Sequence, residues 1–220
     1  LTAKWREEKG ISIQQWVKQK LKDCGNWMGG GTPSMSHPEY WDNGDIVWVT
    51  SKDMKVDLIE DTMLHTNKMG IANSSATYCD KPSVLFVMRS GILRRTLPIA
   101  MIKKPFTVNQ DLKAVSPNDI DTEYLFWVGE ANKKDILKNC MKSGTTVESI
   151  NYNDLLNYEI LIAAKEEQCV IVKLITKALQ KENFVKDAAE SVLDRIDTMK
   201  ISILARAFRG ELGTHDPADE

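Results

Sequence analysis

Long apolar runs are missing from this sequence of 220 residues. The longest, at 84–88 and 160–164, are far shorter than the roughly 20 residues that a membrane-spanning helix needs. A secretory leader is missing as well, because residues 1–8 are charged and helix-prone. We therefore expect a cytoplasmic protein. The first residue is Leu rather than Met, which suggests a fragment or a processed chain.

Cysteine and histidine are too few and too scattered for a metal site or a disulfide framework. The four cysteines stand far apart without a Cys-x-x-Cys pair, and there are only three histidines. The sequence also lacks Gly-x-x-x-x-Gly-Lys-Ser/Thr, Gly-x-Ser-x-Gly, His-Glu-x-x-His and the Asn/Asp-Pro-Pro-aromatic motif of base methylation. We expect this chain to contain no catalytic residue, no bound metal and no cofactor.

A heptad pattern runs through residues 166–208. Such a repeat is typical of a helix that wraps around a partner helix. At about 1.5 Å per residue the helix would be roughly 65 Å long, which is more than a domain of this size needs for its own core. The alternative is a long amphipathic helix that packs on its own domain. The predicted coiled-coil seam consists of Ile171, Ile175, Ala178, Val185, Ala189, Val192, Ile196, Met199 and Ile203.

Short apolar segments separated by Gly, Pro, Asn and Asp fill residues 11–164 and predict a strand-rich domain with some helix. We predict a helix at 130–141, which Ser143 and Gly144 end, and a further helical turn from Asn153. Because prolines bracket 99–102, that strand should be short or at a sheet edge. The fold class is α+β. The predicted strands are 46–50, 84–88, 99–102 and 125–128.

The net charge of −2 argues against a nonspecific polyanion binder, but the charges are unevenly distributed. Residues 81–110 contain six basic side chains and no acid, whereas acids concentrate in the long helix and the tail. One face of the protein can therefore meet nucleic acid while the rest repels it. The alternative is a set of strands whose cations are simply solvated.

Two further segments each have a structural and a functional interpretation. Gly29, Gly30 and Gly31 precede Thr-Pro-Ser, and without the spacing of a phosphate loop they indicate a structural turn. Residues 50–53 follow a predicted strand and form either a polar loop that contacts a ligand or a helix start capped by Ser51.

The best candidates for DNA contact follow the predicted strands. Arginine can donate two hydrogen bonds to guanine or to phosphate, and serine can reach either. If about five phosphates are neutralised, log affinity should fall with log salt at a slope near about −4.5. We expect the two lysines at 103 and 104 to contact the backbone and the others to reach base edges. The candidate residues are Lys52, Arg89, Ser90, Arg94, Arg95, Lys103 and Lys104.

Taken together, several segments resemble the DNA specificity subunit of type I restriction-modification systems. The likeness covers nearly the whole chain in the right order, and the combination is more specific than any single motif. The segments are Gly-Gly-Thr-Pro-Ser at 30–34 with Tyr40-Trp41 and Gly44-Asp-Ile46 beyond it, Arg89-Ser-Gly91, Asn109-Gln-Asp-Leu-Lys113, Gly144-Thr-Thr-Val147, Glu167-Gln168 and Ser202-Ile-Leu-Ala-Arg-Ala-Phe-Arg-Gly-Glu-Leu212.

This resemblance implies a target recognition domain at 11–164 and a long coiled-coil spacer helix at 165–212. Residues 1–10 would be the tail of a preceding helix, and 213–220 an acidic tail. The family's subunit has two such domains and two helices, so this chain resembles a half subunit. It would read one half of a bipartite target in double-stranded DNA and bind methyltransferase and nuclease subunits, which perform the chemistry. We expect self-association through the exposed seam.

Two alternatives remain open. The first is a magnesium-dependent nuclease, in which the Asp-x-Lys pair Asp111 and Lys113 would bind the metal and activate water. The same spacing at 7–9 and 53–55 shows how easily a charged chain yields it by chance. The second is an assembly module with a folded domain and a coiled coil but no DNA binding.

Overall fold

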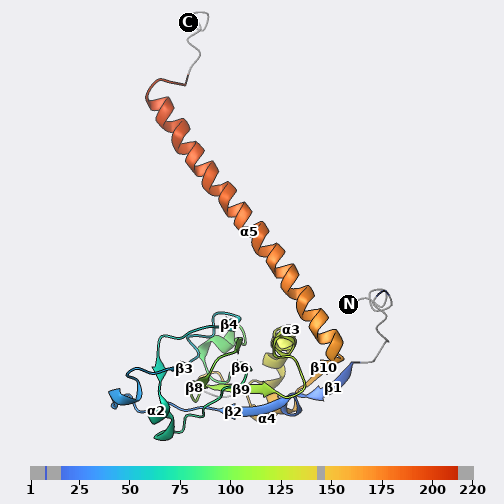
Figure 1. Ribbon diagram of the computed structural model, residues 1–220. Coiled ribbons are helices and arrows are strands. Elements are labelled where there is room, and N and C mark those ends of the chain that lie inside the picture. Colours follow the sequence, from blue (N-terminus) through green and yellow to red (C-terminus); the bar gives the residue numbers. More distant parts are fainter. Residues whose placement is uncertain (1–7, 9–15, 143–146, 213–220) are drawn as a thin grey trace, which may run out of the picture. The chain divides into compact units, whose positions relative to one another are not determined.

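The computed structural model describes residue 8 and residues 16–142 and 147–212. The chain divides into two compact units, Leu1–Val172 and Lys173–Glu220. Figure 1 shows the first unit as a mixed domain of strands and helices and the second as part of one long helix. Within the described residues, no helix is both long and apolar enough to cross a membrane.

Ten short strands and several helices make up the described chain. The strands are β1 (Val17–Lys20), β2 (Gly25–Gly29), β3 (Ile46–Val49), β4 (Leu58–Ile59), β5 (His65–Thr66), β6 (Ser83–Val87), β7 (Ile99–Ile102), β8 (Phe106–Val108), β9 (Leu112–Pro117) and β10 (Glu159–Ile162). The α-helices are α2 (Lys68–Ala72), α3 (Thr122–Cys140), α4 (Tyr152–Asn157) and α5 (Lys165–Phe208), and the 3-10 helices are η1 (Leu21–Asp23), η2 (Pro38–Tyr40) and η3 (Gly91–Arg94).

The largest sheet has five strands in the order β2-β9-β6-β7-β4. Strand β6 lies at its centre, antiparallel to both β7 and β9, and every residue of β6 is buried. The run of Val, Leu and Phe in β6 therefore follows from burial on both faces rather than from alternation. A three-stranded sheet has the order β5-β3-β8, and β3 and β8 run parallel. Strands β1 and β10 form a separate antiparallel pair.

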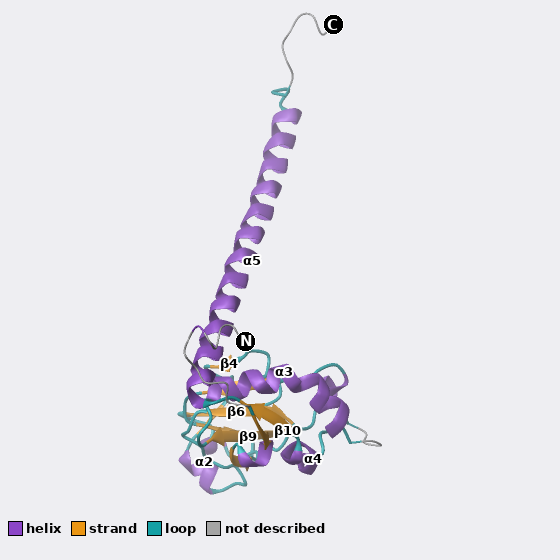
Figure 2. Cartoon of the chain, turned by 90° about the vertical axis from the view of Figure 1, so that its right-hand side faces the viewer, coloured by secondary structure: helices purple, strands orange, loops and turns teal. Residues whose placement is uncertain are grey.

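Helix α3 covers the five-stranded sheet, as Figure 2 shows. The predicted strand at 125–128 is wrong, because these residues lie inside α3. Its aromatic and β-branched side chains favour a strand locally, but Leu125 and Phe126 are completely buried in the core. The helix also has a start signal, since the Asp121 carboxylate accepts a hydrogen bond from the Tyr124 amide. The predicted helix at 130–141 is the second half of α3.

Most of the other predicted elements are confirmed. The strands at 46–50, 84–88 and 99–102 correspond to β3, β6 and β7, and the extra turn from Asn153 is α4. Strand β7 is short, but it is not at an edge, because β4 pairs with its outer side. The helix tail predicted at residues 1–10 lies outside the described residues except for residue 8, and the end signal at 143–144 and the acidic tail at 213–220 also lie outside them.

The three-glycine segment has a structural role, but not as a turn. Residues 30–34 continue without regular structure from the end of β2, and a turn begins only at Met35. A Cβ atom on Gly30 would lie 1.7 Å from the Val108 carbonyl oxygen, and one on Gly31 would lie 2.1 Å from Ser75 Oγ. Glycine is therefore needed at both positions for close approach, and among described glycines only Gly210 has a positive φ.

The long helix predicted from the heptads is confirmed as α5, which runs without interruption from Lys165 to Phe208. Its first two turns belong to the compact domain, where Glu167, Gln168 and Val172 are buried. Gln168 Oε1 accepts from the Asp121 amide at 2.9 Å, and its Nε2 donates to the Ala163 carbonyl at 2.9 Å. These bonds connect the start of α5 to the start of α3 and to the end of β10.

Candidate nucleic-acid interface

Three polar segments meet where β3, β6 and β8 end. Because β3 and β8 are parallel, their carboxyl ends lie together, and the Asn109 amide donates to the Val49 carbonyl at 2.9 Å. The Met88 amide, just after β6, donates to the Asp111 carbonyl at 2.7 Å. Residues 50–53, 88–95 and 109–111 therefore form one surface, which we call the polar end of the domain.

Two clefts border the polar end, one of about 650 Å³ and the other of about 480 Å³. Arg89, Gln110 and Lys142 help to line the larger cleft. Lys52 and Asp111 help to line the smaller. The sequence prediction placed Lys52 and Arg89 in one site, and the fold brings both of them to clefts that share the loop at 109–111.

The segment after β3 is a turn rather than a helix start, so Ser51 caps no helix. Asp53 Oδ2 accepts hydrogen bonds from the Thr50 amide at 2.8 Å and from the Thr50 hydroxyl at 2.7 Å. The Asp53 amide donates in turn to the Thr50 carbonyl. This closed turn holds the exposed side chain of Lys52 at the edge of the smaller cleft.

Arg89 is fixed at the end of β6 by contacts on both sides. Its backbone forms an antiparallel bridge with Ser149, and its Nε donates to Asp111 Oδ1 at 2.8 Å. The Arg89 side chain is 58% exposed, whereas the Asp111 side chain is only 21% exposed. The neighbouring Ser90 hydroxyl accepts from the Ile92 amide and caps η3, so the segment between Arg89 and Arg95 forms a short 3-10 helix.

Arg94 has a second, similar arrangement. Its Nε donates to Glu148 Oε1, and the arginine side chain is 69% exposed against 19% for the glutamate. The hydrogen bond from Arg94 lowers the pKa of the Glu148 carboxyl below its ordinary value of 4.5. Arg95 is exposed and has no ion pair within the described residues.

Lys103 and Lys104 lie at the other end of β6. Strand β7 is antiparallel to β6 and ends at Ile102, which pairs with Ser83 at the start of β6. The five residues of β6 put about 13 Å between Ser83 and Val87. Lys103 forms an ion pair with Glu123, and Lys104 lies close enough to Asp61 to lower the pKa of that carboxyl slightly, after the larger effect of the His65 hydrogen bond.

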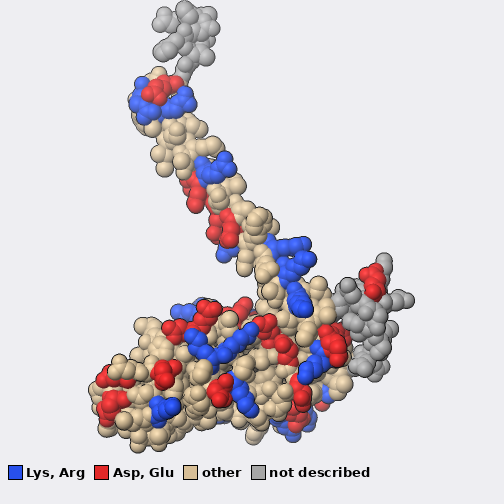
Figure 3. Space-filling view, in the orientation of Figure 1, with Lys and Arg blue, Asp and Glu red and all other residues tan. Residues whose placement is uncertain are grey.

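Residues 81–110 contain no acid in the sequence, but the fold places acidic side chains from other segments beside them. Arg89, Arg94 and Lys103 each pair with a carboxylate from a distant part of the chain. Figure 3 shows acidic and basic side chains interspersed over the face in view rather than one continuous basic surface. The sequence prediction did not include Asp111 and Glu148 as partners of the arginines, although Asp111 lies in a segment that contributed to the family resemblance.

The two side chains of the rival nuclease site have different partners. Asp111 pairs with Arg89, whereas the Lys113 ammonium lies over the Tyr152 ring, 5.0 Å from its centroid. Among the residues that the structure describes, no three His, Cys, Asp or Glu side chains are placed to hold a metal ion.

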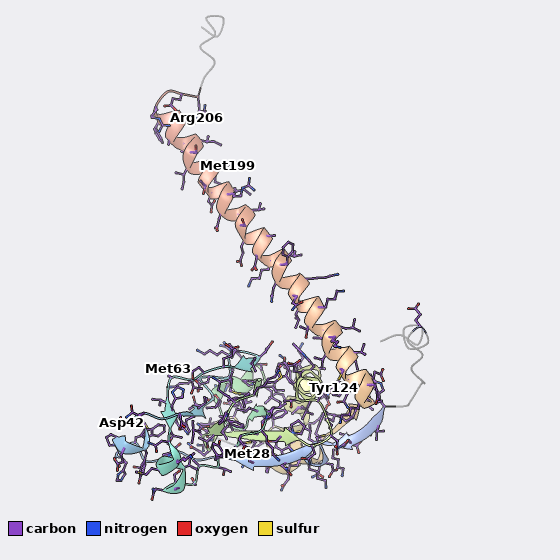
Figure 4. All side chains as sticks on the ribbon, in the orientation of Figure 1. Met28, Asp42, Met63, Tyr124, Met199 and Arg206 are labelled. Carbon is purple, nitrogen blue, oxygen red and sulfur yellow. The ribbon has the colours of Figure 1, made fainter. Side chains whose placement is uncertain are left out.

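The seam of α5 lies mostly on exposed helix. Ile171 packs against the domain core, but from Ala178 onward the seam side chains are exposed, with Val185 at 65% and Met199 at 54%. Figure 4 shows Met199 projecting from the helix. Apolar side chains outside the predicted seam are exposed as well, among them Phe184 at 75% and Phe208 at 90%.

A comparison with known families connects this architecture to DNA recognition. The family described as "Type I restriction modification DNA specificity domain" matches residues 13–193. The chain belongs to this family. Membership confirms the resemblance drawn from the sequence and, at the level of the family, DNA specificity rather than catalysis as the function.

Curated relatives of the chain are specificity subunits. The chain is 37% identical over 158 residues to the type I restriction enzyme EcoR124I/EcoR124II specificity subunit of Escherichia coli, a match that covers 71% of the chain and 39% of the relative. It is 28% identical over 169 residues to the MjaIX specificity subunit of Methanocaldococcus jannaschii, covering 74% of the chain and 38% of the relative. The chain thus spans about two fifths of the relatives' length.

Solved structures show the same fold at low sequence identity. The HsdS subunit from Thermoanaerobacter tengcongensis superposes with a TM-score of 0.63 at 19% identity, over 91% of this chain and 46% of that one. A chain from a study of complex assembly and conformational transition of the type I R-M system gives a TM-score of 0.67 at 18% identity, over 90% and 47% of the two chains. The predicted strand-rich domain with some helix, followed by a long helix, is therefore confirmed as a fold that these two solved chains share over nearly half of their length.

Proposed function

We propose that this chain recognises one half of a bipartite target in double-stranded DNA, through the polar end of its domain. The supporting observation is the meeting of three polar loops with exposed Lys52, Arg89, Arg94 and Arg95 at the ends of β3, β6 and β8, in a member of a DNA specificity family. Loops at strand ends can present side chains to base edges while the sheets hold them in register.

The proposed contacts divide between the two ends of β6. At the polar end, Arg89, Arg94 and Ser90 would approach base edges, and the cations Lys52 and Arg95, unpaired within the described residues, would contact phosphates beside them. Lys104, at the opposite end, would contact a phosphate on the flank of the same duplex, and Lys103 would join it there on exchanging its ion pair with Glu123 for a phosphate. A separation of about 13 Å along β6 is close to the roughly 12 Å width of the major groove, so both groups can meet one duplex.

The second part of this proposal concerns the long helix α5. Its exposed seam from Ala178 to Ile203 matches the pattern of a coiled coil, in which a partner helix would bury the apolar side chains. We propose that α5 sets the spacing of the recognition domain from a second one, that it mediates self-association where no second helix is present, and that the chain binds methyltransferase and nuclease subunits in the cytoplasm.

Purification of the full chain with modification subunits, followed by mapping of methylated adenines across a genome, tests the proposal. We expect the subunits to co-purify and the methylated adenines to share one sequence. Arg94→Ala with Arg95→Ala should weaken duplex binding without changing the circular dichroism spectrum. Co-purification without sequence-specific methylation would instead indicate an assembly module, and magnesium-dependent cutting abolished by Asp111→Ala would indicate a nuclease.

A further inference from the structure

Arg89 and Arg94 share an arrangement that the other candidate cations lack. In each, Nε–H donates to a carboxylate, to Asp111 from Arg89 and to Glu148 from Arg94. In each pair the acid is largely covered and the arginine is more than half exposed. Within the described residues, the terminal nitrogens of the two guanidinium groups have no hydrogen-bond partner.

The acids are themselves held in place. The Asp111 amide donates to Asn109 Oδ1 at 3.1 Å, Asn109 Nδ2 donates to Asp111 Oδ2 at 3.4 Å, and Asn109 is buried. The backbone closes the arrangement, because the Asp111 carbonyl accepts from the Arg89 amide at 3.2 Å. Glu148 is held through its backbone, since its carbonyl accepts from the Ser90 amide at 3.1 Å. Both arginines are thus oriented before any ligand arrives.

An arginine fixed through Nε still presents the donors of its two terminal nitrogens. Two ligands offer a matching pair of acceptors, the O6 and N7 edge of guanine and the oxygens of a phosphate. The carboxylate distinguishes between them. It cancels the charge of the guanidinium, which removes most of its attraction for a phosphate, but it leaves the directional hydrogen bonds to a neutral base edge intact.

We infer that Arg89 and Arg94 recognise guanines in the major groove and that Asp111 and Glu148 are positioning residues that orient them. This inference rests on the proposed function and goes further, because it assigns a base to two named side chains. It also separates these arginines from Lys52, Arg95 and Lys104, which have no ion pair in the described residues and retain their full charge for phosphates.

The test is a binding selection with the full chain on a randomised duplex library, followed by sequencing. The variants are Arg89→Ala, Arg94→Ala and, as the matched control, Arg95→Ala. We expect the unchanged chain to enrich a motif with at least two guanines. Arg89→Ala and Arg94→Ala should each lose about 5- to 150-fold of the preference at a different guanine, whereas Arg95→Ala should keep the motif and lose affinity for all sequences.

Modified duplexes distinguish bases from phosphates. Replacing the selected guanine with 7-deazaguanine removes N7 and should weaken binding of the unchanged chain but not of the corresponding arginine variant. A methylphosphonate next to that guanine should affect both proteins equally. The unchanged chain and the arginine variant differ in affinity for the normal duplex. If this difference disappears with the methylphosphonate but remains with the 7-deazaguanine, the arginine binds phosphate and the inference is wrong.

The positioning role has its own readout. Asp111→Ala removes the acceptor for Arg89 Nε and should weaken the preference for one guanine, whereas Asp111→Asn keeps an acceptor oxygen and should restore most of it. Equal loss in both, or equal loss at all positions of the motif, would mean that Asp111 only supports the fold. If Arg89→Ala and Arg94→Ala still select the same motif, only the inference about the two arginines is wrong. If the unchanged chain enriches no motif, the proposed function is wrong as well.

Discussion

The salt dependence of DNA binding should be set by the unpaired cations of the polar end. Lys52 and Arg95 are exposed there and have no ion pair within the described residues, whereas Arg89 and Arg94 are each neutralised by an acid. A neutralised guanidinium displaces few counterions from DNA, so its removal should change affinity without changing the salt slope. The double variant Lys52→Gln, Arg95→Gln should change the slope itself.

The magnitude follows from the number of phosphates that the protein neutralises. Removing one cation that neutralises a phosphate reduces the slope of log affinity against log salt by about 0.9, so removing two should reduce it by about 1.8. When salt is raised from about 50 to 200 mM, the factor by which affinity falls should therefore be about 12 times smaller for the double variant than for the unchanged chain. A slope near about −4.5, as for five neutralised phosphates, requires cations beyond these two, and Lys104 is one further candidate.

Fluorescence anisotropy titrations of a labelled duplex at several salt concentrations measure this slope. The matched control is Arg89→Gln with Arg94→Gln, which removes the same number of cations from the same surface and should change the slope by less than about 0.5. If the control pair reduces the slope as much as Lys52→Gln with Arg95→Gln does, the acids do not neutralise their arginines toward DNA, and the division between paired and unpaired cations is wrong.

Three further predictions concern stability and reactivity. Gly30→Ala places a methyl group against the Val108 carbonyl and should cost at least about 2 kcal/mol, lowering Tm by several degrees, whereas Gly91→Ala, with open space around the site, should leave Tm within about 1 °C. Of the four cysteines only Cys169 is exposed, so a thiol reagent should label one site in the native protein and none in Cys169→Ser. The pKa of Glu148 is lowered in the fold, so its pairing stabilises the protein above about pH 4.5 and is lost as pH falls further. The melting temperatures of Glu148→Gln and the unchanged chain should differ at pH 7 and approach each other as the pH falls below 4.5, and a constant difference would contradict this.

The local sequence pattern was sufficient to predict those helices and strands whose surroundings are the same along their whole length. The heptads predicted α5 because one helix keeps the same periodicity over 44 residues. The runs of Val, Leu and Ile predicted β3, β6 and β7 because these strands are buried along their whole length. Residues 125–128 were misassigned since a short apolar run is equally compatible with a buried helix, and only packing against β6 and β7 decides between them.

The candidate site was predictable only in part, because its electrostatics depend on contacts between distant segments. Arg89 and Asp111 are 22 residues apart, and Arg94 and Glu148 are 54 residues apart. The sequence showed cations clustered after strands, which was enough to select them as candidates. It could not show which of them the fold would pair with an acid, and that pairing is what separates the proposed base contacts of Arg89 and Arg94 from the proposed phosphate contacts of Lys52 and Arg95.

Because each arginine lies far in the sequence from its acid, specificity can change without a substitution of the arginine itself. Each arginine and its acid come from different segments, so a substitution at 109–111 or 147–150 can reorient an arginine that it leaves in place. Loss of Asp111 would free Arg89 to turn toward the backbone, which would raise nonspecific affinity while lowering discrimination. Affinity and specificity in this domain should therefore respond in opposite directions to loss of the acid and together to loss of the arginine.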